Sequence, residues 1–174
     1  MTGGTSTFKT TTSGESRLVD LPTGQLSLTT EPGSVSVDSL CGFAARINPK
    51  RAFLFVSKVL GRHIPVRPSM MRAAHQELAR RLPPDLPGPV VFFGFAETAI
   101  ALAYGVFREY MQLHQRSDGY FIHSTRYRFQ RPLLAEFRED HSHAADHLIY
   151  GPSGRAEMAR LVSAKSLVLV DDEL

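Results

Sequence analysis

The chain is poor in cysteine and has no long apolar run. Cys41 is the single cysteine among 174 residues, so the chain cannot form an internal disulfide, which fits a reducing compartment. No apolar run approaches the ~20 residues needed to cross a bilayer, and the first residues lack the order of a secretory signal. We therefore expect a cytoplasmic protein without a membrane partner, in which Cys41 is a small buried apolar residue.

The sequence also has no zinc finger, aromatic RNA-binding motif or array of basic helices, which disfavours nucleic acid as a partner. Basic residues nevertheless gather between residues 46 and 81, where a polyanionic small molecule, a nucleic acid or plain solvent could face them. With 43% apolar and 21% charged residues, the composition is typical of a globular domain. The first 17 residues are rich in Thr, Ser and Gly, which predicts a disordered tail over 1–17 and one domain over 18–174.

Apolar periodicity predicts alternating strands and helices. Apolar and polar residues alternate on both sides of a turn at 31–34, which predicts a β-hairpin over 25–37. Residues 127–146 lack regular periodicity and are interpreted as a long loop. We expect strands at 53–59, 90–93, 119–125, 147–150 and 167–170, and helices at 69–82, 97–114 and 155–162. This order indicates an α/β fold with a mostly parallel sheet and helices on both faces.

Two strand ends carry the residues of greatest chemical interest. Leu167–Val170 reads as a buried strand, and two carboxylates, Asp171 and Asp172, follow it directly. Pro89–Ala103 reads as a strand, a tight turn at Gly94 and a helix. Such a junction directs unpaired N–H groups and the positive end of a helix at one point, which favours anion binding.

These two units, in this order, resemble the signature of type I phosphoribosyltransferases. A narrower resemblance covers residues 40–174 and is to the orotate-phosphoribosyltransferase-like proteins associated with bacterial tellurium-resistance gene clusters. It is carried by residues 46–66, 94–99 and 136–144. The resemblance implies the type I phosphoribosyltransferase fold, with a small N-terminal β-rich hood over the nucleobase and with the C-terminal part of the fold missing.

The resemblance also implies roles for individual residues in binding phosphoribosyl pyrophosphate (PRPP). Asp171 and Asp172 hold the ribose hydroxyls and Mg²⁺, and Lys58 and Arg62 are further PRPP-binding candidates. The pyrophosphate is assigned to Gly94, Phe95, Ala96, Glu97 and Thr98. A mobile catalytic loop after the second core strand supplies the catalytic candidates Arg126, Glu139, His141 and His143.

The predicted activity is transfer of phosphoribose to a nucleobase-like acceptor, with release of pyrophosphate and a homodimer as the expected assembly. The resemblance places the donors for the 5′-phosphate after the acidic pair, so we expect this chain alone to bind PRPP weakly and to lack measurable transferase activity. Glu97 adds a carboxylate to the predicted pyrophosphate site, which favours the alternative of a non-catalytic nucleotide-sensing or scaffolding module. A second alternative is a metal-dependent hydrolase that uses His141, His143 and His147, and a third interpretation of these histidines is a solvated loop.

Overall fold

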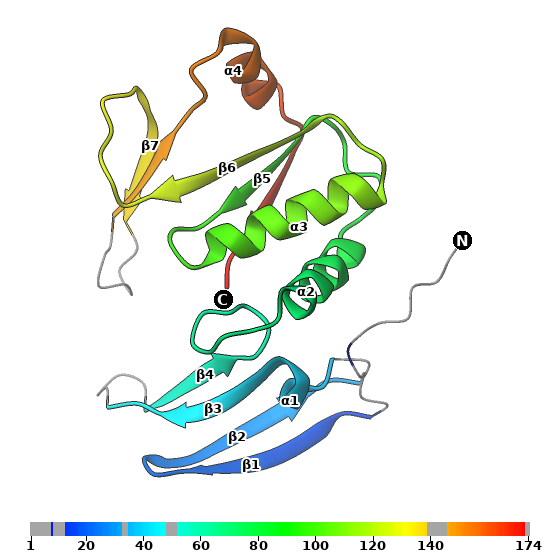
Figure 1. Ribbon diagram of the computed structural model, residues 1–174, viewed down its shortest axis with the longest axis vertical. Helices are drawn as coiled ribbons and strands as arrows, with labels where there is room; N and C mark the ends of the chain where they lie inside the picture. Colours follow the sequence, from blue (N-terminus) through cyan, green and yellow to red (C-terminus); the bar gives the residue numbers. More distant parts are fainter. Residues whose placement is uncertain (1–7, 9–12, 33–34, 48–51, 139–145, 173–174) are drawn as a thin grey trace. The chain divides into compact units, whose positions relative to one another are not determined.

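The computed structural model describes residues 8, 13–32, 35–47, 52–138 and 146–172. The chain forms two compact units, residues 1–74 and 75–174 (Figure 1). Each unit buries its own apolar side chains.

The first unit is β-rich and contains two antiparallel hairpins. Its elements are β1 (Glu15–Leu21), β2 (Gly24–Thr30), α1 (Val37–Leu40), β3 (Cys41–Ala45) and β4 (Phe53–Ser57). The hairpin predicted over 25–37 was wrong in its partner, because β2 pairs with the upstream strand β1 and Val37 begins a short helix. The turn lies at 22–23. Gly24, the first residue of β2, follows it and adopts a positive φ of 134°, which favours glycine.

Ordered structure begins inside the segment predicted to be a tail. Strand β1 starts at Glu15, and Phe8 is only 5% exposed, where it packs with Val59 and Ala74. An aromatic side chain that buries its surface in this way offsets part of the entropy lost on ordering the chain. Helix α2 (Pro68–Arg81) contributes Met70 and Ala73 to the same cluster and confirms the helix predicted over 69–82.

The second unit is a five-stranded mixed sheet in the order β7-β8-β6-β5-β9 (Figure 1). Strands β5 (Val90–Gly94), β6 (Gly119–Thr125) and β9 (Ser166–Val170) run parallel, as predicted. Strands β7 (Leu133–Arg138) and β8 (Asp146–Tyr150) pair antiparallel to each other, and β8 is antiparallel to β6. The sheet is therefore mixed, and 127–146 is not one long loop. All six residues of β7 are exposed, which explains why no burial pattern marked it as a strand.

One face of this sheet is covered by α3 (Ala99–Leu113), while α4 (Arg155–Val162) precedes β9 (Figure 1). Phe92 of β5 contacts both Phe107 and Tyr110 of α3, with ring centroids 5.5 and 5.4 Å apart. On the opposite face of β9, Leu167 and Leu169 are each 60% exposed. The prediction of helices on both faces is therefore corrected: the second face is only partly covered.

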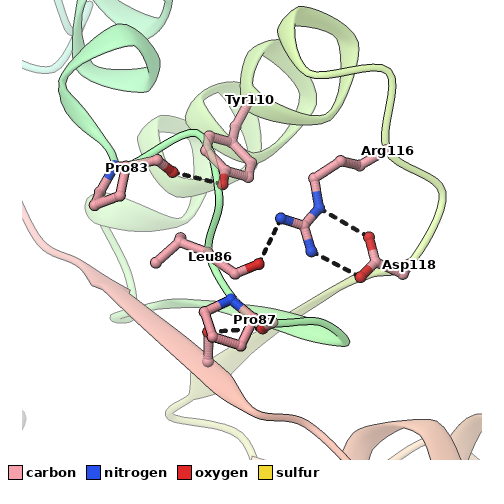
Figure 2. A network of polar contacts seen from close by, with 7 residues as sticks. Pro83, Leu86, Pro87, Tyr110, Arg116 and Asp118 are labelled. Atoms are coloured by element: carbon pink, nitrogen blue, oxygen red, sulfur yellow. Dashed lines mark hydrogen bonds and ion pairs between the residues drawn. The ribbon is translucent and has the colours of Figure 1, made fainter.

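The proline-rich segment before β5 is tied to the end of α3 and the start of β9 (Figure 2). Arg116 forms a two-pronged ion pair with Asp118 and donates a third hydrogen bond to the Leu86 carbonyl at 2.6 Å. The Tyr110 hydroxyl donates to the Pro83 carbonyl at 2.8 Å, and Ser166 Oγ donates to the Pro87 carbonyl. These bonds fix the amino ends of β5 and β9 and so leave the carboxyl ends to form the site. Among the helices in the described ranges, none is long and apolar enough to cross a membrane.

Candidate functional site

The carboxyl ends of the three parallel strands meet at one edge of the sheet. Gly94, the last residue of β5, lies in register with His123 of β6 and Val170 of β9. The residues that follow these strand ends therefore converge, as expected for open α/β sheets. They are the loop 95–98, the strand end 124–126 and the pair Asp171–Asp172.

Thr98 joins the start of α3 to the acidic pair. It occupies the N-cap position of α3, but its side chain makes no capping hydrogen bond. Instead its hydroxyl donates to Oδ1 of Asp172, 3.0 Å away. The first N–H groups of a helix have no acceptor inside the helix, and the helix dipole makes this end positive. The residues predicted to bind pyrophosphate and ribose are thus brought into contact, at a helix end suited to an anion.

Gly94 is required by close packing of β5 against α3. A Cβ atom at this position would lie 2.8 Å from Cβ of Ala103 and 3.4 Å from the backbone of Ile100. Larger residues would push the first turns of α3 away from the strand end. Gly94 therefore sets where the helix N-terminus lies relative to the acidic pair.

The acidic pair is half-buried and internally ordered. The N–H of Asp172 donates to Oδ1 of Asp171 at 2.9 Å, and the N–H of Phe95 donates to the Val170 carbonyl at 3.4 Å. Within the residues that the structure describes, no group of three or more His, Cys, Asp or Glu side chains forms a metal cage. Two adjacent carboxylates still suit Mg²⁺, which prefers hard oxygen donors and usually keeps waters and substrate phosphates as its other ligands.

The loop after β5 is held at Ala96 by Ser124, which the sequence did not single out, and by the predicted candidate Arg126. The N–H of Ala96 donates to Ser124 Oγ at 2.8 Å, and its carbonyl accepts a hydrogen bond from Arg126 at 3.0 Å. The peptide bond between Ala96 and Glu97 is cis, and the Glu97 side chain is exposed. Ser124 could not be predicted because a serine in a strand has no sequence signal of its own, although its position two residues before Arg126 puts both side chains on one face.

Of the histidines in the predicted metal cluster, only His147 lies within the described residues, and no metal-binding group of three or more side chains forms among those residues. His147 lies in β8, is 1% exposed, and shares a 2.8 Å hydrogen bond with Ser124 through Nδ1. Its ring stacks on Phe137, with centroids 4.5 Å apart and planes 6° apart. Glu139, His141 and His143 lie outside the described residues. The hypothesis of a metal-dependent hydrolase is therefore not supported, since His147 is buried among aromatic rings.

The two basic candidates from the N-terminal half belong to the first unit. Lys58 follows β4 directly, and its Nζ donates to the Asp38 carbonyl at 2.9 Å. The Asp38 carboxylate pairs with Arg17 at 2.6 Å, and this hydrogen bond lowers the pKa of Asp38. Arg62 is exposed and lies in the segment between β4 and α2.

Cys41 was predicted to be a small buried apolar residue, and the structure shows it half-buried at the start of β3. Burial raises the pKa of its thiol, while the positive charge of Lys58 acts in the opposite direction. A raised pKa keeps the sulfur protonated at neutral pH, and the thiol is a poor nucleophile in that form.

Residues 40–174 match the family model described as phosphoribosyl transferase. The chain belongs to this family. No curated protein matches the sequence. As a phosphoribosyl transferase, the chain carries within the matched range all five strands of the mixed sheet, the loop after β5 and both carboxylates. The match begins after β1 and β2, so the first hairpin lies outside the family region.

Proposed function

We propose that the edge formed by residues 95–98, 124–126 and 171–172 binds PRPP with Mg²⁺. The chain would then transfer the phosphoribosyl group to a nucleobase-like acceptor and release pyrophosphate. The observation that carries the proposal is the 3.0 Å hydrogen bond between Thr98 and Asp172, because it places the N-terminus of α3 beside the acidic pair. Membership of the phosphoribosyl transferase family supports the same reaction.

The chemistry of PRPP matches this juxtaposition. Its pyrophosphate is attached at C1 of the ribose, next to the hydroxyls on C2 and C3. A binding site must therefore offer anion-binding N–H groups and hydroxyl acceptors side by side. The first turn of α3 offers the N–H groups, and the carboxylates of Asp171 and Asp172 accept hydrogen bonds from hydroxyls.

The same groups stabilise the proposed transition state. A nitrogen of the acceptor forms a bond to C1 while the bond from C1 to the pyrophosphate oxygen breaks, and the leaving group takes the electron pair. The acceptor nitrogen then loses its proton to solvent. Positive charge develops on the ribose ring near the two carboxylates, and negative charge develops on the leaving group near the helix end. Bound Mg²⁺ would neutralise pyrophosphate charge, with Asp171 and Asp172 as the residues to hold it.

Several finer assignments belong to this proposal and rest on the sequence resemblance. Lys58 and Arg62 are proposed as further PRPP ligands, and Glu139, His141 and His143 as groups of the catalytic loop. The orotate-phosphoribosyltransferase-like branch, with its association to tellurium-resistance gene clusters, is proposed on the same basis. A homodimer in the cytoplasm is the corresponding expectation for assembly and location.

Isothermal titration of Mg²⁺-PRPP into the chain tests the proposal directly, because it measures binding whether or not turnover follows. The double variant Asp171→Asn/Asp172→Asn should weaken binding at least tenfold, because each charge-assisted hydrogen bond contributes about 1.5–3 kcal/mol. Asp85→Asn is the matched control, since it changes an exposed carboxylate before the amino end of β5. Equal Kd values for the Asp171→Asn/Asp172→Asn variant and the Asp85→Asn control would contradict the proposal. So would no binding by the unmodified chain at millimolar PRPP. Binding without pyrophosphate release across a panel of bases would instead support a non-catalytic module.

A further inference from the structure

Apart from Tyr110, whose hydroxyl bonds to Pro83, Ser124 and His147 are the polar side chains buried in the described chain, 0% and 1% exposed. They come from neighbouring strands, β6 and β8, and share a hydrogen bond of 2.8 Å between Ser124 Oγ and His147 Nδ1. Burying a polar group is unfavourable unless a partner replaces water. Ser124 and His147 lie beside the candidate site, and their hydrogen bonds replace the water that they lose on burial.

Both polar groups of the Ala96 residue are held by the end of β6. Its N–H donates to Ser124 Oγ at 2.8 Å, and its carbonyl accepts from Nη2 of Arg126 at 3.0 Å. Each of these side chains also reaches β8. Ser124 is bonded to His147, and Nη1 of Arg126 donates to the Asp146 carbonyl at 2.9 Å. Ala96 is therefore linked to two consecutive residues of β8. Ser124 links it to His147, and Arg126 links it to Asp146.

Aromatic packing fixes the ring of His147. His147 stacks on Phe137 of β7 and meets the edge of Phe95, whose centroid is 6.1 Å away. Phe95 also contacts Phe93 of β5 edge-on at 4.9 Å. The imidazole therefore cannot turn freely, and its Nδ1 stays directed at Ser124.

We propose that Ser124, Arg126 and His147 act together as positioning residues that hold the Ala96 peptide. By fixing Ala96, they set the direction of the next residues, Glu97 and Thr98, which lead into α3. This inference rests on the proposed function, because the pyrophosphate is what those residues would meet. In this role Arg126 acts through the backbone of the loop.

Paired variants separate this role from general stabilisation. His147→Phe keeps an aromatic ring for Phe137 and Phe95 but removes the Nδ1 atom, whereas His147→Asn keeps a hydrogen-bonding atom at the Nδ1 position and loses the ring. Ser124→Ala removes the hydroxyl that Ala96 uses, whereas Ser124→Thr retains it. If Ser124→Thr is too large for its buried position, the His147 pair still decides the question.

Amide hydrogen exchange of Ala96 is the first measurement, since it needs no ligand. We expect about fivefold or faster exchange of this amide in Ser124→Ala and His147→Phe, from the loss of one hydrogen bond, and a change within twofold in Ser124→Thr and His147→Asn. Unchanged exchange of Ala96 in both Ser124→Ala and His147→Phe, in chains that melt as folded proteins, overturns the proposal.

Titration of Mg²⁺-PRPP is the second measurement. The hydroxyl and Nδ1 deletions should raise the Kd for PRPP about five- to tenfold, and the conservative variants should restore it. If the unmodified chain does not bind PRPP, the proposed function fails while amide exchange still judges the positioning role. A loss of affinity equal in His147→Asn and His147→Phe, with Ala96 exchange unchanged, would assign His147 to stability alone.

Discussion

Gly105 of α3 lies against the imidazole of His75 on α2, so closely that a methyl group at position 105 would overlap the ring. Glycine costs helix stability, and replacement by alanine in an ordinary helix position would be favourable by roughly 1 kcal/mol. At Gly105 the packing of α2 on α3 outweighs that preference. The two helices are in contact because one of them has no side chain there.

We therefore expect Gly105→Ala to lower the free energy of unfolding by roughly 1–3 kcal/mol, because an overfilled contact displaces the half-buried ring of His75. Urea denaturation followed by circular dichroism measures this change. Gly42→Ala is the control, since its Cβ would meet only the end of Lys58 at 3.7 Å. A stabilised Gly105→Ala chain would show that His75 moves aside without cost.

The same histidine predicts a pH dependence of stability. Burial lowers the pKa of His75, while the charge of Glu109 acts weakly in the opposite direction. The unfolded chain then binds more protons than the folded one below a pH of about 6.5. The free energy of unfolding should fall as the pH drops through this value and level off once the folded pKa is passed. His75→Leu should show a smaller loss between about pH 7.5 and 5.5 than the unmodified chain, with His63→Gln, an exposed histidine, as the control.

Removing the hydroxyl of Tyr110 should destabilise the second unit. Tyr110 is 0% exposed, and its hydroxyl donates to the Pro83 carbonyl (Figure 2). Tyr110→Phe deletes the donor and should lower the free energy of unfolding by about 1–2 kcal/mol. Tyr104→Phe makes the same chemical change on a residue that is 48% exposed, and should change the free energy much less. Equal effects in denaturation curves would contradict the role of this bond.

Gly94→Ala should weaken PRPP binding by displacing the first turns of α3. The added methyl group meets Cβ of Ala103 at 2.8 Å, so we expect at least a tenfold increase in the Kd for Mg²⁺-PRPP and a lower melting temperature. The double variant Gly94→Ala/Ala103→Gly removes that contact and should recover part of the affinity, although glycine in the helix costs about 1 kcal/mol. No recovery in the double variant would point to the Ile100 backbone as the main obstacle.

Several elements could be predicted because their side chains are buried on a regular pattern. Val90–Gly94 is buried at every position, and the helices after β5 and after β8 were found at nearly their true limits. Strand β7 was missed because an exposed edge strand leaves no apolar alternation. The hairpin partner of β2 was missed because its turn is set by the backbone of Gly24, which alternation alone does not locate.

The candidate site was predictable where it depends on topology and not where it depends on side-chain contacts. Parallel strands bring their carboxyl ends to one edge of the sheet, which agrees with the resemblance that assigned both the loop after β5 and Asp171–Asp172 to PRPP. The bond between Ser124 and His147 joins residues 23 positions apart on different strands. No spacing in a single sequence encodes such a contact.

The edge of β9 has a consequence for association between copies of the chain. In the described ranges β9 pairs on one side only, with β5, and it exposes Leu167 and Leu169 beside that open edge. An open edge invites a further strand from another molecule. Parallel addition of a second β9 would bring four carboxylates, two from each Asp171–Asp172 pair, next to one another. Antiparallel addition would send the two pairs to opposite ends of the joined strands and so avoid this like-charge repulsion.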